Sequence, residues 1–164
     1  MKSNMESKVN RLISIGILLV LGFWIPSHFS FTRTRSLDHR LFYITSPNRE
    51  AAPGKDSYVM FRHDNPMIAD LIRETRTDRI IKKVVCAGGD HLKVVHREFY
   101  CDGQMLGRAV ERTPSGASIG HFEYDGIISQ NKLFVMGSSP DSYDSRYFGF
   151  VDRQSVIALA YPVL

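Results

Sequence analysis

Two adjacent lysines, Lys82 and Lys83, interrupt an otherwise apolar run, IIKKVVC, at residues 80–86. Ile and Val favour a β-strand, in which successive side chains point to opposite faces, so we expect one lysine to face the interior and the other to face solvent. Burial lowers a lysine pKa, and a neutral lysine amine can act as a general base that activates a serine hydroxyl. The strand alone leaves open a second interpretation, in which both lysines lie at a strand edge with their amines in water.

A second stretch that could serve chemistry is PDSYDSRYFGFV, residues 140–151, where aspartates, serines and an arginine are mixed with aromatic residues. It lies between two apolar runs, KLFVMG and SVIALAYPVL. A solvent-exposed loop has no need of the aromatic rings, and a core strand does not tolerate unpaired charges. We therefore expect a buried polar network packed under bulky rings.

Other chemistries find little support in the sequence. The six histidines are dispersed, and His91 and His96 are five residues apart on a predicted strand, so their side chains should point to opposite faces. No metal site and no cofactor are predicted, since there is also no Gly-rich phosphate loop and no GxSxG nucleophile elbow. The net charge of +4 is modest and scattered, which does not favour a nucleic-acid partner.

The elements that would position these residues are mostly strands. Asn65-Pro66 predicts one helix start, with an N-cap and a proline at the first helical position, and residues 107–130 are predicted to be rich in loops. Asp102-Gly103 predicts a hairpin turn. The fold class is therefore mainly β: one antiparallel-rich domain with one or two short helices. The predicted strands are 41–45, 57–63, 79–86, 91–97, the two arms of a hairpin at 97–106, 132–137 and 155–163.

The N-terminal segment predicts the compartment. Residues 12–31 carry no charge and are long enough to cross a bilayer, with Trp24 at the interface and no small-x-small cleavage site. We expect a cytoplasmic tail at 1–11, a transmembrane anchor in contact with membrane lipid at 12–31, and a periplasmic domain at 32–164 of a bacterial inner-membrane protein. A buried core helix is the alternative. Orientation rests on translocation of the long C-terminal domain, since three cations on each side nearly balance: Lys2, Lys8, Arg11 before the segment and Arg33, Arg35, Arg40 after it.

The chain has two cysteines, Cys86 and Cys101. In an oxidising compartment they could form a disulfide that closes a loop of about 15 residues and contributes about 3 kcal/mol on the chain-entropy model. Two buried thiols are the alternative, and the sequence does not decide between them.

Three blocks in fixed order carry a resemblance to a known family: TRSLDHRLF (34–42), KKVVCAGGD (82–90) and GSSPDSYDSRYFG (137–149). With PGKDSYVMF (53–61), they make the chain similar to the membrane-anchored type I signal peptidases, S26-like Ser-Lys peptidases, and closest to the TraF-like pilin-processing peptidases of conjugative transfer. The resemblance implies a serine endopeptidase that cleaves a membrane or exported precursor protein.

Carried over position by position, the resemblance implies that Ser36 is the nucleophile and Lys82 the general base. Ser142 would orient the lysine, and Asp144 and Arg146 would form an ion pair beneath the site, with Tyr147 and Phe148 covering it. It also implies that Gly89 and Asp90 close the turn behind the lysine strand. CAGG departs from the family's GLPG and puts Cys86 beside the site, where a disulfide to Cys101 could stiffen the neighbouring hairpin.

The sequence also departs from the family. No proline or glycine follows Ser36, although those residues shape the nucleophile turn in relatives. Ser30 and Ser27 are rival nucleophiles, but they lie in the predicted membrane segment. Two further functions therefore stay open: a non-enzymatic envelope scaffold with a degenerate peptidase fold, and a general signal peptidase. The sequence leaves the substrate, and the choice between hydrolysis and cyclisation of a pilin, undecided.

Overall fold

The computed structural model describes residues 8, 10–19, 22, 28–32, 36–46, 53–62, 79–113 and 115–164. No helix among these residues is both long and apolar enough to span a membrane. Residues 20–21 and 23–27 of the predicted anchor lie outside the described part of the chain, as does the helix predicted to begin at Asn65-Pro66.

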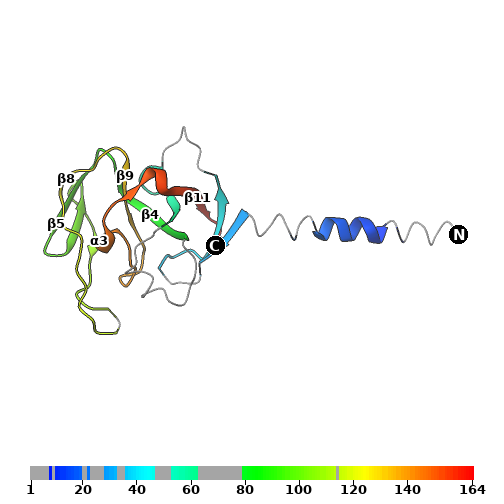
Figure 1. Cartoon of the computed structure of the whole chain (residues 1–164), viewed down its shortest axis with the longest axis horizontal. Helices are drawn as coiled ribbons and strands as arrows, with labels where there is room; N and C mark the ends of the chain where they lie inside the picture. Colours follow the sequence, from blue (N-terminus) through cyan, green and yellow to red (C-terminus); the bar gives the residue numbers. More distant parts are fainter. Residues whose placement is uncertain are drawn as a thin grey trace.

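The described residues of the β body form two antiparallel sheets (Figure 1). The first sheet has seven strands, in the spatial order β1 (Phe29–Phe31), β2 (Leu41–Thr45), β11 (Val156–Pro162), β3 (Tyr58–Arg62), β4 (Arg79–Ala87), β9 (Lys132–Met136) and β10 (Val151–Asp152). The second has four, in the order β7 (Gln104–Arg108), β6 (Glu98–Cys101), β5 (His91–Val95) and β8 (Asp125–Ile127). The short helix α3 (Ser145–Phe148) and the 3-10 turn η1 (Arg153–Ser155) follow β9 and β10. The predicted mainly β, antiparallel fold class is confirmed.

Most predicted strands are present near their predicted bounds, and the exceptions have physical reasons. Asp102 and Gly103 both have positive φ, 49° and 83°, as the tight hairpin turn between β6 and β7 requires. The strand predicted at 91–97 ends at Val95, because His96 and Arg97 also adopt positive φ and form a turn. The interpretation that His91 and His96 share a strand is therefore wrong.

Three strands were not anticipated: the two-residue β10, β8 and β1. β8 is only three residues long and contains a glycine, so it shows no apolar alternation in the sequence. β1 is formed by residues 29–31, the last three of the predicted membrane segment, and pairs with β2 through Phe29–Tyr43 and Phe31–Leu41. The described β body therefore begins within the segment that hydropathy alone assigned to the membrane.

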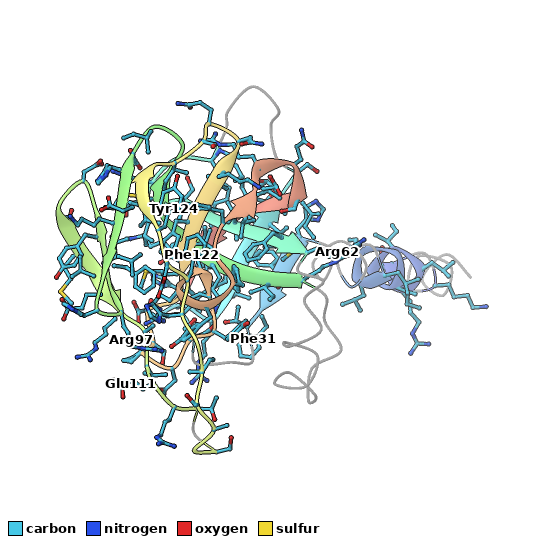
Figure 2. All side chains as sticks on the ribbon, turned by 60° about the vertical axis from the view of Figure 1, so that its left-hand side comes forward. Phe31, Arg62, Arg97, Glu111, Phe122 and Tyr124 are labelled. Atoms are coloured by element: carbon cyan, nitrogen blue, oxygen red, sulfur yellow. A yellow bond between two sulfur atoms is a disulfide. The ribbon has the colours of Figure 1, made fainter. Side chains whose placement is uncertain are left out.

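An aromatic cluster joins the two sheets. Phe99 of β6 stacks on Phe134 of β9 with ring centroids 5.5 Å apart. Phe122 lies between the sheets and packs edge-on against Phe150 at 5.1 Å (Figure 2). The sheets are also joined covalently, because Cys86 of β4 and Cys101 of β6 form a disulfide. The second sheet is thus fixed against the part of the first that carries Lys82.

The C-terminus follows β11 and lies beside the start of β2 in the first sheet. The carbonyl of Leu164 accepts hydrogen bonds from the backbone N–H groups of Arg40 and Leu41, so the chain ends beside the start of β2 (Figure 1). This contact helps to fix the segment that leads from Ser36 into β2.

Candidate active site

The candidate site begins at Lys82 in the middle of β4. Lys82 pairs with Val59 of β3 and lies on the same face as Ile80 and Val84, so its stem is surrounded by apolar side chains. Only 3% of Lys82 is exposed. Lys83 points to the opposite face, where its amine forms a 2.7 Å ion pair with the exposed Asp56. The expectation that one lysine is buried and the other is not is confirmed.

The Lys82 amine has a specific partner. Lys82 Nζ donates a 2.6 Å hydrogen bond to Ser142 Oγ, which is itself buried. Burial lowers the pKa of Lys82 to about 8; the carboxylate of Asp144 opposes this shift and the guanidinium of Arg146 adds to it. A lysine amine with this pKa is partly neutral near pH 7 and can accept a proton.

Asp144 and Arg146 lie together beneath Ser142. Asp144 is completely buried, and its carboxylate accepts 2.8 Å hydrogen bonds from both Nε and Nη2 of Arg146. The same carboxylate caps helix α3 by accepting a bond from the Arg146 backbone N–H. The expected ion pair is therefore present in a bidentate geometry, which fixes both planes.

The guanidinium of Arg146 also satisfies three backbone carbonyls. It donates to Ser142 at 3.0 Å, to Ser139 at 3.1 Å and, on its other side, to Arg108 at 3.0 Å. The ring of Tyr147 lies against it, 5.9 Å from centroid to guanidinium carbon. Because every arm of the guanidinium is used, the loop that carries Ser142 is held in one position under the Lys82 amine.

Gly137 is a functional position that sequence reasoning missed. Its N–H donates a 2.9 Å hydrogen bond to Asp144, and a Cβ added to it would overlap both Ser142 Oγ and the carbonyl oxygen of Ser36. Two otherwise separate parts of the chain meet over this glycine because it has no side chain. The signal in the sequence was its place at the start of the GSSPDSYDSRYFG block, although the packing that requires glycine is not visible there.

Ser36 lies in the turn at residues 36–38, directly beside this glycine. Its carbonyl accepts a 2.9 Å hydrogen bond from the Ser138 N–H. The next residue, Leu37, is 5% exposed and packs in the cluster that contains Ile81, the neighbour of Lys82. The structure thus brings Ser36 together with Ser142 around Gly137, and Ser142 holds Lys82.

The remaining predicted residues have simpler roles in the structure. Gly89, at φ 98°, and Asp90 form the turn from β4 to β5, where the Asp90 carboxylate accepts a 2.7 Å bond from Ala87 N–H. Phe148 packs on Phe61 in the first core cluster, with ring centroids 6.3 Å apart.

The rival serines are less well placed. Ser30 lies on β1 and pairs with Phe42, on the far edge of the first sheet from Ser142, while Ser27 lies outside the described residues. Among the described residues, one group of three could approach a metal ion: Cys86, Asp90 and Cys101. Its two sulfur atoms are bonded to each other in the disulfide.

Comparison with known proteins places the chain in a family. The model of the signal peptidase family, peptidase S26, matches residues 11–164. The chain belongs to this family. It is 28% identical over 154 residues to a probable signal peptidase I-2 from Synechocystis sp., an alignment that covers 92% of the chain and 66% of that protein.

Two further relatives are plasmid and conjugal transfer proteins. The chain is 28% identical to a plasmid transfer protein TraF from Escherichia coli, over 52% of the chain and 50% of that protein. A conjugal transfer protein TraF from Agrobacterium fabrum is 32% identical over 51% of the chain and 48% of that protein. The chain thus spans about half to two thirds of the length of these relatives. A signal peptidase I crystal structure from Enterococcus faecalis superposes with a TM-score of 0.38 and 21% identity, covering 65% of the chain and 94% of that structure.

Proposed function

We propose that this S26 protein is a membrane-anchored serine endopeptidase in which Ser36 is the nucleophile and Lys82 the general base. The observation that carries the proposal is the buried Lys82 amine, with its pKa lowered to about 8 and its hydrogen bond to Ser142. An amine that is costly to keep protonated is suited to take a proton from a serine hydroxyl. The contact of Ser36 and Ser142 with the same glycine supports the pairing.

In the proposed reaction, Lys82 takes the proton of the Ser36 hydroxyl as its oxygen attacks the carbonyl carbon of the scissile peptide bond. Backbone N–H groups near Ser36 would stabilise the oxyanion. The lysine then returns the proton to the leaving amine, and the acyl group stays on Ser36. Water releases a new carboxyl group by hydrolysis of this ester. A peptide amine in place of water would release an amide, which in the same chain is a cyclic product.

The register of β4 supports a place for the substrate. Residues 79–83 pair with β3, whereas pairing with β9 begins only at Lys83, opposite Met136. Within the described residues, β4 therefore has no strand partner at 79–82 on its β9 side. An extended peptide could pair there and bring a carbonyl to the end of the Lys82 side chain. We place the residues before the scissile bond on this edge.

The substrate we propose is a membrane or exported precursor, and specifically a conjugative pilin. It would have an extended segment that can reach the edge of β4. The similarity to two TraF proteins supports the conjugative assignment, and cyclisation of the pilin would use the same acyl-enzyme. The alternative is a general signal peptidase that acts on exported precursors, which the Synechocystis relative supports.

A non-enzymatic scaffold in the envelope is the second candidate function. It is favoured by one observation, the absence of proline and glycine in the residues that follow Ser36 (SLDHRLF). A scaffold would not need Ser36 or Lys82, so substitution of either residue would leave its function intact.

The test is intact-mass and N-terminal mapping of envelope proteins from cells that carry wild type, Ser36→Ala or Lys82→Ala. Membrane-fraction levels of the variants serve as the folding control. We expect one small precursor to keep its unprocessed mass in both variants, and a product lighter than the linear cleaved chain by one water would indicate cyclisation. Normal maturation of all precursors in cells with stable variants would reject the peptidase and favour the scaffold.

A further inference from the structure

A cleft of about 560 Å³ lies beside the candidate active site. Residues 106–111, from β7 and the segment after it, form one wall, and residues 136–138 with Pro140 form the other. The walls are mostly apolar, through residues such as Val110 and Met136, and the exposed Glu111 is the last residue of the first wall, where we place the rim of the cleft. This volume and mostly apolar lining lie within the range of ligand-binding pockets, about 300–1,000 Å³.

The cleft is continuous with the catalytic groups. Gly137 and Ser138 belong to its wall, and they are the residues that touch Ser142 and hold the Ser36 carbonyl. Arg146 joins the two walls, because one of its nitrogens binds the Arg108 carbonyl while another binds the carbonyls of the Ser142 loop. The guanidinium that fixes the lysine partner therefore also fixes the width of the cleft.

The wall formed by residues 106–111 is held by hydrogen bonds of its own. Arg97, in the turn between β5 and β6, donates hydrogen bonds to the carbonyls of Ala109 at 3.1 Å and Ile119 at 2.9 Å, and to that of Val110. Tyr147 accepts a 3.0 Å bond from the Val110 N–H. These bonds hold the segment after β7 against α3, so the cleft is built before any peptide arrives.

We infer that this cleft binds the residues on the C-terminal side of the scissile bond, that is, the leaving segment of the polypeptide substrate. The inference rests on the proposed function, which places the residues before the bond along β4 at 79–82. A peptide that follows β4 reaches Lys82 at its scissile carbonyl. It next meets Gly137 and Ser138, where β9 ends and the cleft begins. The apolar walls would select apolar side chains after the cleavage point, and the rim has no net charge to attract acidic ones because the Glu111 carboxylate lies 3.7 Å from the Arg108 guanidinium.

The test uses a peptide library that is generated by digesting the proteome of the cells that produce the protein, so no substrate has to be known in advance. The purified full chain in detergent is incubated with the library, and cleavage products are mapped by mass spectrometry to give residue preferences on both sides of each cut. Two variants change the cleft: Val110→Lys in its wall and Glu111→Lys at its exposed rim. Met105→Lys is the matched control, since Met105 is an exposed neighbour on β7 outside the cleft.

We expect both cleft variants to gain at least about a threefold enrichment of acidic residues at one or more positions after the cut, with preferences before the cut unchanged. Met105→Lys should reproduce the wild-type profile. The inference is overturned if preferences change only before the cut, if they do not change in either cleft variant, or if Met105→Lys changes them equally. Glu111→Lys keeps the test valid if Val110→Lys fails to fold, because the Glu111 side chain is exposed and its replacement should not disturb folding. If the wild type makes no cut that Ser36→Ala abolishes, the proposed function itself fails, and this inference fails with it.

Discussion

At the scale of single residues, the decisive feature is that Lys82 lies on the core face of its strand. Alternation along β4 placed one of two lysines inside, and the structure buries Lys82 between Ile80 and Val84. The cost of an unpaired buried ammonium is reduced when the group is neutral, which is why burial and a lowered pKa occur together here.

The first prediction concerns pH. Because the pKa of Lys82 is lowered to about 8, the amine is mostly protonated at pH 6 and mostly neutral at pH 9. A general base acts in its neutral form, so kcat/KM should rise about tenfold per pH unit well below pH 8 and level off above it. The measurement is a pH–rate profile on a peptide that the enzyme cuts. A profile that is flat from pH 6 to 9, under conditions in which the protein stays folded throughout, would argue against Lys82 as the base.

Gly137 gives the second prediction at this scale. Gly137→Ala would place a methyl group against Ser142 Oγ and the Ser36 carbonyl, so one of the two must move. Displacements of about 1 Å at a catalytic group cost on the order of 10²-fold in rate. We expect kcat to fall by about that factor while the protein still folds, as measured by steady-state kinetics beside circular dichroism. Gly120→Ala is the control, since nothing lies within 4 Å of its added Cβ, and an equal loss of rate in that variant would contradict the argument.

At the scale of elements, the sequence predicted what depends on local pattern. The strand predicted at 41–45 coincides with β2, and Asp102-Gly103 forms the hairpin turn that this residue pair predicts. The end of β5 could not be predicted, because the positive φ of Arg97 is stabilised by side-chain bonds to Ala109 and Ile119, which are distant in sequence. The candidate site divides in the same way. Alternation predicted the burial of Lys82, the family resemblance supplied Ser142 and the ion pair, and Gly137 emerged only from packing.

The disulfide is the element-scale feature with a measurable contribution. Cys86 and Cys101 join β4 of the first sheet to β6 of the second and close a loop between residues 15 apart. Its loss should lower the free energy of unfolding by about 3 kcal/mol. Urea unfolding of the full chain in detergent, with and without a reductant, measures this directly. Cys86→Ala/Cys101→Ala should match the reduced wild type and be insensitive to the reductant; equal stability of the oxidised and reduced protein would refute the prediction.

At the scale of the whole molecule, the described β body and the apolar N-terminal segment set different parts of the proposed function. The body holds the candidate catalytic groups and the cleft, while the apolar residues before β1 are proposed to keep them at the periplasmic face of the inner membrane. The disulfide agrees with an oxidising compartment. Confinement of enzyme and precursor to one membrane surface raises their effective concentration without any new contact.

This division predicts that removal of residues 1–27 separates two activities. The shortened chain should cut a free soluble peptide with a kcat/KM within about threefold of wild type, because residues 28–164 contain every group assigned to the site. Processing of a membrane-embedded precursor should fall by about 10²-fold or more, the range that effective concentration supplies. Replacement of the segment with an unrelated single-span anchor of the same orientation should restore it, as followed by precursor mass in cells. If the unrelated anchor fails while the free peptide is still cut, the native segment must contact the precursor itself, and simple tethering is the wrong account.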